Sequence, residues 1–123
     1  MGTVMIILQI AAALGLLNVW LLRFNRRTGY RGGDAGSMPE EFAAYGLPVW
    51  SAYVIGALKI GSALALIAGI WLPALVLPAA ALISILMLGA LAMHARIRDP
   101  LKKFLPALGM LVLCLGIIWG AIR

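Results

Sequence analysis

The sequence predicts an all-α integral membrane protein in which four spanning helices form a single bundle. Of its 123 residues, 64% are hydrophobic and only 11% are charged, whereas charged residues make up roughly 25% of soluble domains. Four apolar stretches have the length needed to cross a bilayer, which takes about 20 residues at about 1.5 Å per residue. None alternates apolar and polar residues as the strands of a membrane barrel do. The chain 1–123 is therefore expected to be one helical membrane domain.

The predicted spans leave one long polar segment, which separates the first span from the second. The spans are residues 4–22, 52–72, 74–93 and 104–122. Within the connection 23–49, Ser37 and Glu40 have the spacing of a capping box, Pro39 suits a first helical turn and Gly46 suits a stop. We therefore expect a short amphipathic helix here, which lies on the membrane, plugs the cytoplasmic mouth of the bundle or is a solvated helix of the loop.

The distribution of charge predicts the orientation in the membrane. The net charge is +6, and the basic residues gather in the two connections 23–49 and 94–103. In a four-helix chain these connections share one side, so the positive-inside rule predicts cytoplasmic connections and external termini. The excess of basic residues is thus explained mainly by the topology, and attraction to anionic lipid headgroups is a secondary effect. A bacterial plasma membrane is the expected location, and nucleic acid is not an expected partner.

Four tryptophans fall at predicted span ends, where interfacial aromatic residues are favoured: Trp20, Trp50, Trp71 and Trp119.

Small residues at four-residue spacing predict faces where helices approach closely. The second span has the longest such stripe, and the first and fourth spans have shorter ones. The residues are Ala57, Gly61, Ala65 and Gly69 in the second span, Ala11 and Gly15 in the first, and Gly116 and Gly120 in the fourth. These faces indicate a compact bundle. The contacts form either inside one chain or between two chains, so both a monomer and a homo-oligomer are compatible with the sequence.

Lys59 is a cation in the middle of the second span. It lies nine residues from Trp50, which places it roughly 13 Å deep. A cation at a helix centre costs about 2.5–3.5 kcal/mol, so a compensating interaction is expected. All acidic residues lie outside the spans, and the polar groups near its depth are Gln9, Ser62 and Ser84. Three interpretations remain: a structural hydrogen-bond network, contact with a polar or anionic group of a lipophilic ligand, or a relay in a water-filled path.

His94 ends the third predicted span. A helix C-terminus favours histidine without any function, and a lone histidine makes no metal site. Cys114 is the only cysteine, so paired-thiol chemistry and cysteine clusters are excluded within one chain. No metal site is predicted. The functional interpretation of His94 is a hydrogen-bonding or proton-donating group at the headgroup level, with Tyr45, Tyr53 and Asp99 as candidate neighbours.

Two short motifs carry a resemblance to a known family. Gly56 and Lys59 form G-x-x-K in "IGALKIGSALAL", and Gly89, Ala90 and His94 form G-A-x-x-x-H in "GALAMHARIRDP", after the amphipathic "PEEFAAYGLPVW". From about Gly29 to its end, the chain resembles the DoxX-like family of small four-helix membrane proteins. That resemblance implies an association with thiosulfate:quinone oxidoreduction, with other membrane oxidoreductases, or with the assembly of membrane proteins. A quinone or a bound lipid is the implied ligand.

Two functions follow as hypotheses. The first is a redox-associated or quinone/lipid-binding accessory subunit with Lys59 facing the bundle interior. Its candidate ligand-binding residues are Lys59, Ser62, Gln9, Ser84, His94 and Tyr53. The second is a non-catalytic membrane scaffold or assembly factor that acts through the small-residue faces. No haem, iron-sulfur or dinucleotide motif is present, so the chain is not expected to be an enzyme on its own. Proton-coupled export of cations is disfavoured because no acid lies in a span.

Overall fold

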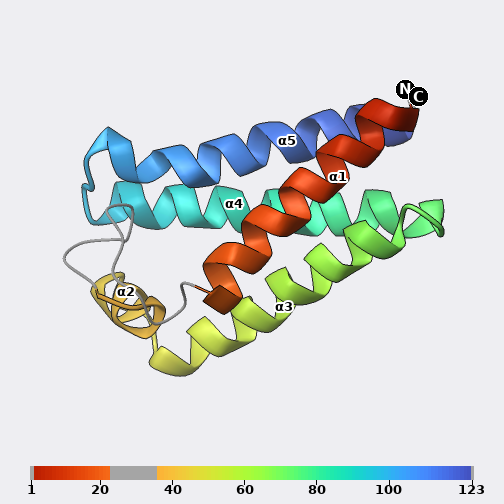
Figure 1. The fold of residues 1–123 in the computed structure, drawn as a ribbon. Coiled ribbons are helices and arrows are strands. Elements are labelled where there is room, and N and C mark those ends of the chain that lie inside the picture. Colours follow the sequence, from red (N-terminus) through yellow and green to blue (C-terminus); the bar gives the residue numbers. More distant parts are fainter. Residues whose placement is uncertain (1, 23–35, 123) are drawn as a thin grey trace.

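The computed structural model describes residues 2–22 and 36–122, which form four long helices and one short helix (Figure 1). Within these ranges the structure contains no strand. In chain order the elements are α1 (Gly2–Leu17), the π-helical turn η1 (Asn18–Leu22), α2 (Met38–Ala44), α3 (Val49–Ala68), η2 (Pro73–Leu75), α4 (Val76–Arg96), η3 (Leu101–Phe104) and α5 (Leu105–Ile122). Each long helix is long and apolar enough to cross a membrane. The predicted all-α membrane bundle with a short additional helix is confirmed.

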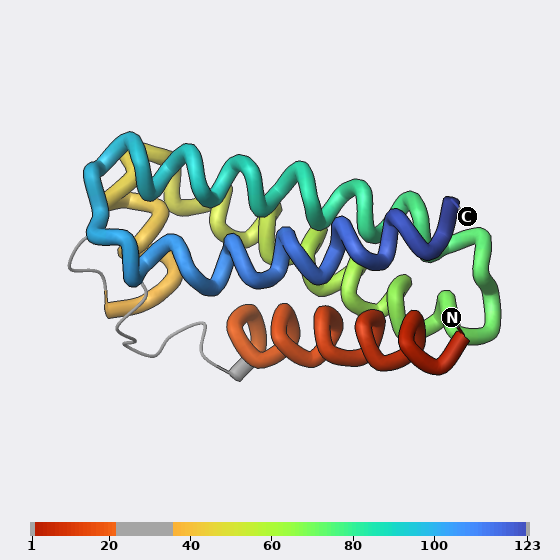
Figure 2. The backbone as a smooth tube through the Cα atoms, turned by 90° about the horizontal axis from the view of Figure 1, so that it is seen from above, coloured from red at the N-terminus to blue at the C-terminus, as the bar shows by residue number. Residues whose placement is uncertain are grey.

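The long helices pack as two pairs, α4 with α5 and α1 with α3. Figures 1 and 2 show that both termini lie at one end of the bundle, together with the turn between α3 and α4. We call this the terminal end. The opposite end, here named the α2 end, holds α2 and the η3 connection (Figure 1). Because α1 crosses the α4–α5 pair at an angle, the two pairs diverge toward the α2 end, and α2 lies where they separate.

Hydrophobic side chains cover much of the outer surface of the four long helices, as expected for helices solvated by lipid. Three tryptophans near helix ends, Trp50, Trp71 and Trp119, are exposed. Trp20 differs from the expectation of an interfacial position, because its side chain is only 4% exposed. Its ring packs on Gly56 of α3, where a Cβ atom would lie 2.9 Å from the ring. The missing side chain of Gly56 therefore lets Trp20 turn inward.

Helix α2 plugs the α2 end of the bundle. The capping interaction predicted at its start is formed, since Ser37 Oγ accepts a hydrogen bond from the backbone N–H of Glu40 at 3.4 Å. Three apolar side chains of this segment are buried: Met38, Phe42 and Tyr45. Gly46 then ends the segment with a φ of 82°, a left-handed conformation that glycine adopts without strain. Of the three expected positions for this helix, the structure therefore has the plug.

The small residues do not all face the same way. Four glycines lie close to a side chain of another helix, which a Cβ added to the glycine would contact. The pairs are Gly15 with Met110, Gly69 with Val76, Gly116 with Leu8 and Gly120 with Met5. These four glycines therefore permit close approach inside the chain. On α3, Ala57 and Gly61 instead face outward, and a Cβ on Gly61 would meet nothing within 4 Å. In the outer part of the α3 stripe, Ala57 is thus exposed, and a side chain added at Gly61 would meet none of the described residues within 4 Å.

Candidate functional site

A cavity of about 830 Å³ lies at the α2 end, where all five helices contribute to its walls. This volume is within the range of about 300–1,000 Å³ typical of small-molecule pockets. The polar side chains on its walls are Asn18, Glu41, Tyr45, Lys59, His94 and Lys103. Methionines from three helices contribute to the rest of the wall: Met38, Met87, Met93 and Met110. Because methionine is flexible and polarisable, such a wall adapts to ligands of different shape.

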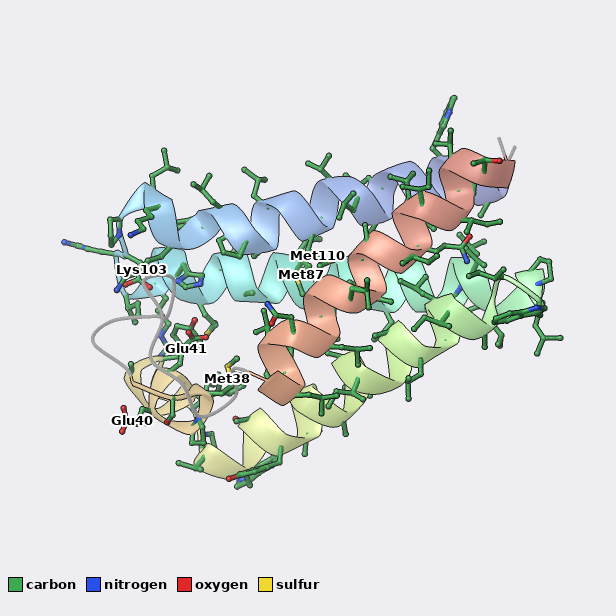
Figure 3. The ribbon with its side chains drawn as sticks, viewed as in Figure 1. Met38, Glu40, Glu41, Met87, Lys103 and Met110 are labelled. Atoms are coloured by element: carbon green, nitrogen blue, oxygen red, sulfur yellow. The ribbon has the colours of Figure 1, made fainter. Side chains whose placement is uncertain are left out.

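The cavity has a polar end and an apolar end. Figure 3 shows Glu41 directed from α2 toward α4, with Lys103 on the same side, whereas Glu40 points away from the bundle. Met87 and Met110 lie further along the bundle, away from α2 (Figure 3). Since one end offers charges and the other offers thioether and aliphatic groups, the cavity suits an amphiphilic molecule.

Lys59 is brought into this cavity by α3. Its side chain is 7% exposed, and its Nζ lies 4.6 Å from the centroid of the Trp20 ring. This cation–π contact compensates part of the cost of an ammonium group in a membrane span. Glu41 lines the same cavity and interacts electrostatically with Lys59.

The ammonium group of Lys59 makes no hydrogen bond to any residue in the ranges 2–22 and 36–122. Every fully buried side-chain N or O atom in those ranges has a hydrogen-bond partner. Nζ of Lys59 is therefore not sealed inside protein but faces the cavity that Lys59 lines. It is available there as a donor for an acceptor atom of a ligand.

His94 belongs to a buried network that joins α2, α4 and η3. Its Nδ1 lies 2.6 Å from Asp99 Oδ2, and its Nε2 lies 3.4 Å from the hydroxyl oxygen of Tyr45. Lys103 Nζ is 3.8 Å from the other carboxylate oxygen of Asp99. The rings of Tyr45 and Phe104 both contact the imidazole. Tyr45 and Asp99 are thus two of the three neighbours that the sequence suggested for His94, and the third, Tyr53, is exposed on α3.

Four of the six predicted ligand-binding residues lie elsewhere. Gln9 donates a hydrogen bond from Nε2 to the backbone oxygen of Leu66 at 2.9 Å, which ties α1 to α3. The hydroxyl group of Ser84 donates to the backbone oxygen of Ala80, one turn earlier in α4. Ser62 is buried away from the cavity, and Tyr53 is exposed on α3. The structure therefore brings only Lys59 and His94, of the six, to the cavity.

Trp20, Glu41 and Lys103 line the cavity but were not predicted from the sequence as site residues. Glu41 is 18 residues before Lys59 in the sequence and outside every span, so nothing in the local pattern placed it near the lysine. The only usable signal was the amphipathic character of α2, which indicated that one of its faces could enter the bundle. Among the described residues, no group of three or more His, Cys, Asp and Glu side chains could hold a metal ion.

Together, the four spanning helices, the inserted α2 and the cavity define a small integral membrane protein with a cavity of small-molecule size between its helices. Comparison with protein families matches residues 34–117, more than half of the chain, to the DoxX-like family. The chain belongs to the DoxX-like family. The match includes α2, α3, α4 and most of α5, and hence both Lys59 and His94. Searches of curated proteins and of solved structures gave no match.

Proposed function

We propose that this protein is a redox-associated accessory subunit that binds a quinone or a lipid in the cavity at the α2 end. The observation that carries the proposal is the Lys59 ammonium group, which faces the cavity without a hydrogen bond to the described part of the chain. A quinone carbonyl or a lipid phosphate supplies the oxygen acceptor that this donor lacks. The apolar wall around Met87 and Met110 accommodates the ring or chain behind that oxygen.

The residues present fit such a ligand in a second respect. The Trp20 ring already lies against Lys59 and forms part of the cavity wall. An aromatic wall packs well against a flat ring or an alkyl chain. In this proposal the chain binds and orients its ligand, and any electron transfer belongs to a partner oxidoreductase in the membrane.

We also propose an orientation in a bacterial plasma membrane. The α2 end carries the basic connections, which include Lys102 and Lys103, and it faces the cytoplasm under the positive-inside rule. The arginines of the first connection lie at residues 23–31, outside the described residues. In this orientation the ligand's polar group sits toward the cytoplasmic leaflet, and both termini lie outside.

Identification of co-purifying molecules tests the ligand proposal. Wild-type protein purified gently in detergent is extracted, and its quinones and lipids are quantified by mass spectrometry per mole of protein. We expect a bound quinone or lipid in the wild type and its loss in Lys59→Met. The matched control is Lys102→Met, which removes a cation that does not line the cavity. Wild-type protein without bound quinone or lipid above a control membrane protein, or equal retention by Lys59→Met, would contradict the proposal.

A scaffold function is the second candidate, and one observation favours it. Ala57 and Gly61 are small, exposed residues on the outer side of α3, and an added Cβ on Gly61 meets no described atom within 4 Å. Such a surface permits close approach of another helix in the membrane. If it joins two copies of this chain, Gly61→Leu should convert dimers to monomers in native mass spectrometry while Lys59→Met leaves the dimer intact. A dimer that survives Gly61→Leu, or monomers only in the wild type, would contradict self-association through this face.

A further inference from the structure

The network around His94 has the arrangement of an oriented base next to a hydroxyl group. The 2.6 Å bond between His94 Nδ1 and the Asp99 carboxylate places the hydrogen on Nδ1, since a carboxylate accepts it. Nε2 is then left as an acceptor, and the hydroxyl of Tyr45 is the group 3.4 Å from it. Both Tyr45 and His94 also line the cavity. A carboxylate that fixes the tautomer of a histidine in this way is a recurrent feature of acid–base sites.

We propose that Tyr45, His94 and Asp99 form a proton relay that accepts the proton of an ionisable hydroxyl group on the ligand in the cavity. The ligand class that this requires is a weakly acidic amphiphile, such as a phenol or a quinol. The inference rests on the proposed function, because it needs a ligand bound at the α2 end. It goes further by giving the cavity a proton-exchange activity and by naming the group that receives the proton.

The transfer balances without an oxidant or a further reactant. The O–H bond of the ligand breaks as its proton moves to the oxygen of Tyr45, and the proton of the Tyr45 hydroxyl moves to His94 Nε2. The ligand becomes an oxyanion, the imidazole becomes an imidazolium, and the net charge of the site does not change. The Asp99 carboxylate stabilises the imidazolium, and the Lys59 ammonium group, which lines the same cavity, is the cation available to the oxyanion.

The charged groups around the relay come from several elements. Asp99 and Lys103 belong to the connection between α4 and α5, Glu41 to α2 and Lys59 to α3. The cavity residues contributed by α1, η1 and α5 are uncharged. Lys103 Nζ lies 3.8 Å from Asp99, so the Asp99 carboxylate interacts with both Lys103 and His94, whereas Glu41 and Lys59 line the cavity with opposite charges.

Nitrogen NMR of His94 tests the relay directly. The chain has one histidine, so protein labelled with ¹⁵N-histidine and purified through a histidine-free tag reports on His94 alone. The probes are a long-chain alkyl nitrophenol and its methyl ether, which has the same shape but no proton to give. In the wild type we expect a neutral imidazole with hydrogen on Nδ1, conversion to imidazolium with the nitrophenol, and no conversion with the ether.

Two variants separate a relay from a structural latch. Tyr45→Phe keeps the ring but removes the hydroxyl, so the nitrophenol should still bind while the imidazolium signal falls to the level seen with the ether. Asp99→Asn should move the hydrogen of the free imidazole from Nδ1 toward Nε2. If the nitrophenol binds the wild type and His94 stays neutral, or if Tyr45→Phe converts as fully as the wild type, the relay is wrong and the binding function stands. If neither probe binds, the relay fails, and the proposed function is decided separately by the quinone and lipid content of the purified protein.

Discussion

Gly56 is the position where the structure makes its sharpest prediction about stability. A Cβ added by Gly56→Ala would lie 2.9 Å from Cε3 and 3.1 Å from Cζ3 of the Trp20 ring. That ring cannot move freely, because Phe42 packs against it edge-on at 6.1 Å and the Lys59 ammonium group lies over it. The extra methyl group must therefore displace Trp20 or separate α1 from α3.

The expected cost follows from a comparison with Gly61→Ala in the same helix. Both substitutions gain the same helix propensity, up to about 1 kcal/mol, but a Cβ on Gly61 meets nothing within 4 Å. Overpacking a tight contact costs typically about 1–3 kcal/mol. The free energy of unfolding of Gly56→Ala should therefore be about 1–3 kcal/mol lower than that of Gly61→Ala.

Unfolding by a denaturing detergent in mixed micelles, followed by circular dichroism, measures this difference. A second measurement, the amount of co-purified quinone or lipid, should also fall in Gly56→Ala, because Trp20 holds one wall of the cavity beside Lys59. Equal stability of the two alanine variants would refute the close packing of Trp20 on α3 and the cavity wall that depends on it.

Three further predictions concern the helix contacts, the plug and the orientation. Gln9→Leu removes the hydrogen bond to the backbone of Leu66 and should lower the free energy of unfolding by about 0.6–1.7 kcal/mol; unchanged stability in the same detergent titration would contradict this. Phe42→Ala removes a buried aromatic side chain of α2, so amide exchange should accelerate in α2 but not in α4. A protected α2 would argue against the plug. In intact cells an impermeant maleimide should label the variant Leu72→Cys but not the variant Lys102→Cys. The native Cys114 is buried, so it should contribute little labelling of its own. The opposite pattern would reverse the proposed orientation.

The spanning helices could be predicted from the sequence because lipid is their solvent. A lipid-facing helix stays apolar on all sides, so length and hydropathy alone reveal it. The short helix α2 was also predictable, since Ser37, Glu40 and Gly46 are local signals that act within one turn. The depth of its insertion was not predictable, because it depends on how Phe42 and Met38 pack against residues far away in the chain.

The small-residue stripe of α3 shows why helix faces are harder to predict. Ala57 and Gly69 are twelve residues apart, and at 3.6 residues per turn they differ by about 120° around the helix axis. One end of the stripe can therefore face outward while Gly69 packs on Val76 inside the chain. The glycine that contacts Trp20 is Gly56, immediately before the stripe, and only the three-dimensional packing identifies it.

The candidate site was predictable only in its central residues. A lysine in the middle of a span is unusual enough to stand out from the sequence, and His94 stands out as the single histidine of the chain; both line the cavity. Gln9 and Ser84 had suitable depth, but backbone carbonyl groups of Leu66 and Ala80 compete for their hydrogens. Depth along a span does not show which neighbour a polar side chain faces. The sequence therefore could not show that Gln9 and Ser84, unlike Lys59, do not line the cavity.

Photo-crosslinking tests most directly whether the cavity holds a ligand. A photoreactive quinone analogue and a photoreactive phospholipid are each added to the protein in nanodiscs, and the labelled residues are mapped by peptide mass spectrometry. We expect one of them to label cavity residues such as Met87 and Met110, with loss of that labelling in Lys59→Met and retention in Lys102→Met. Labelling confined to outward residues such as Tyr53, or cavity labelling that is equal in Lys59→Met, would contradict it.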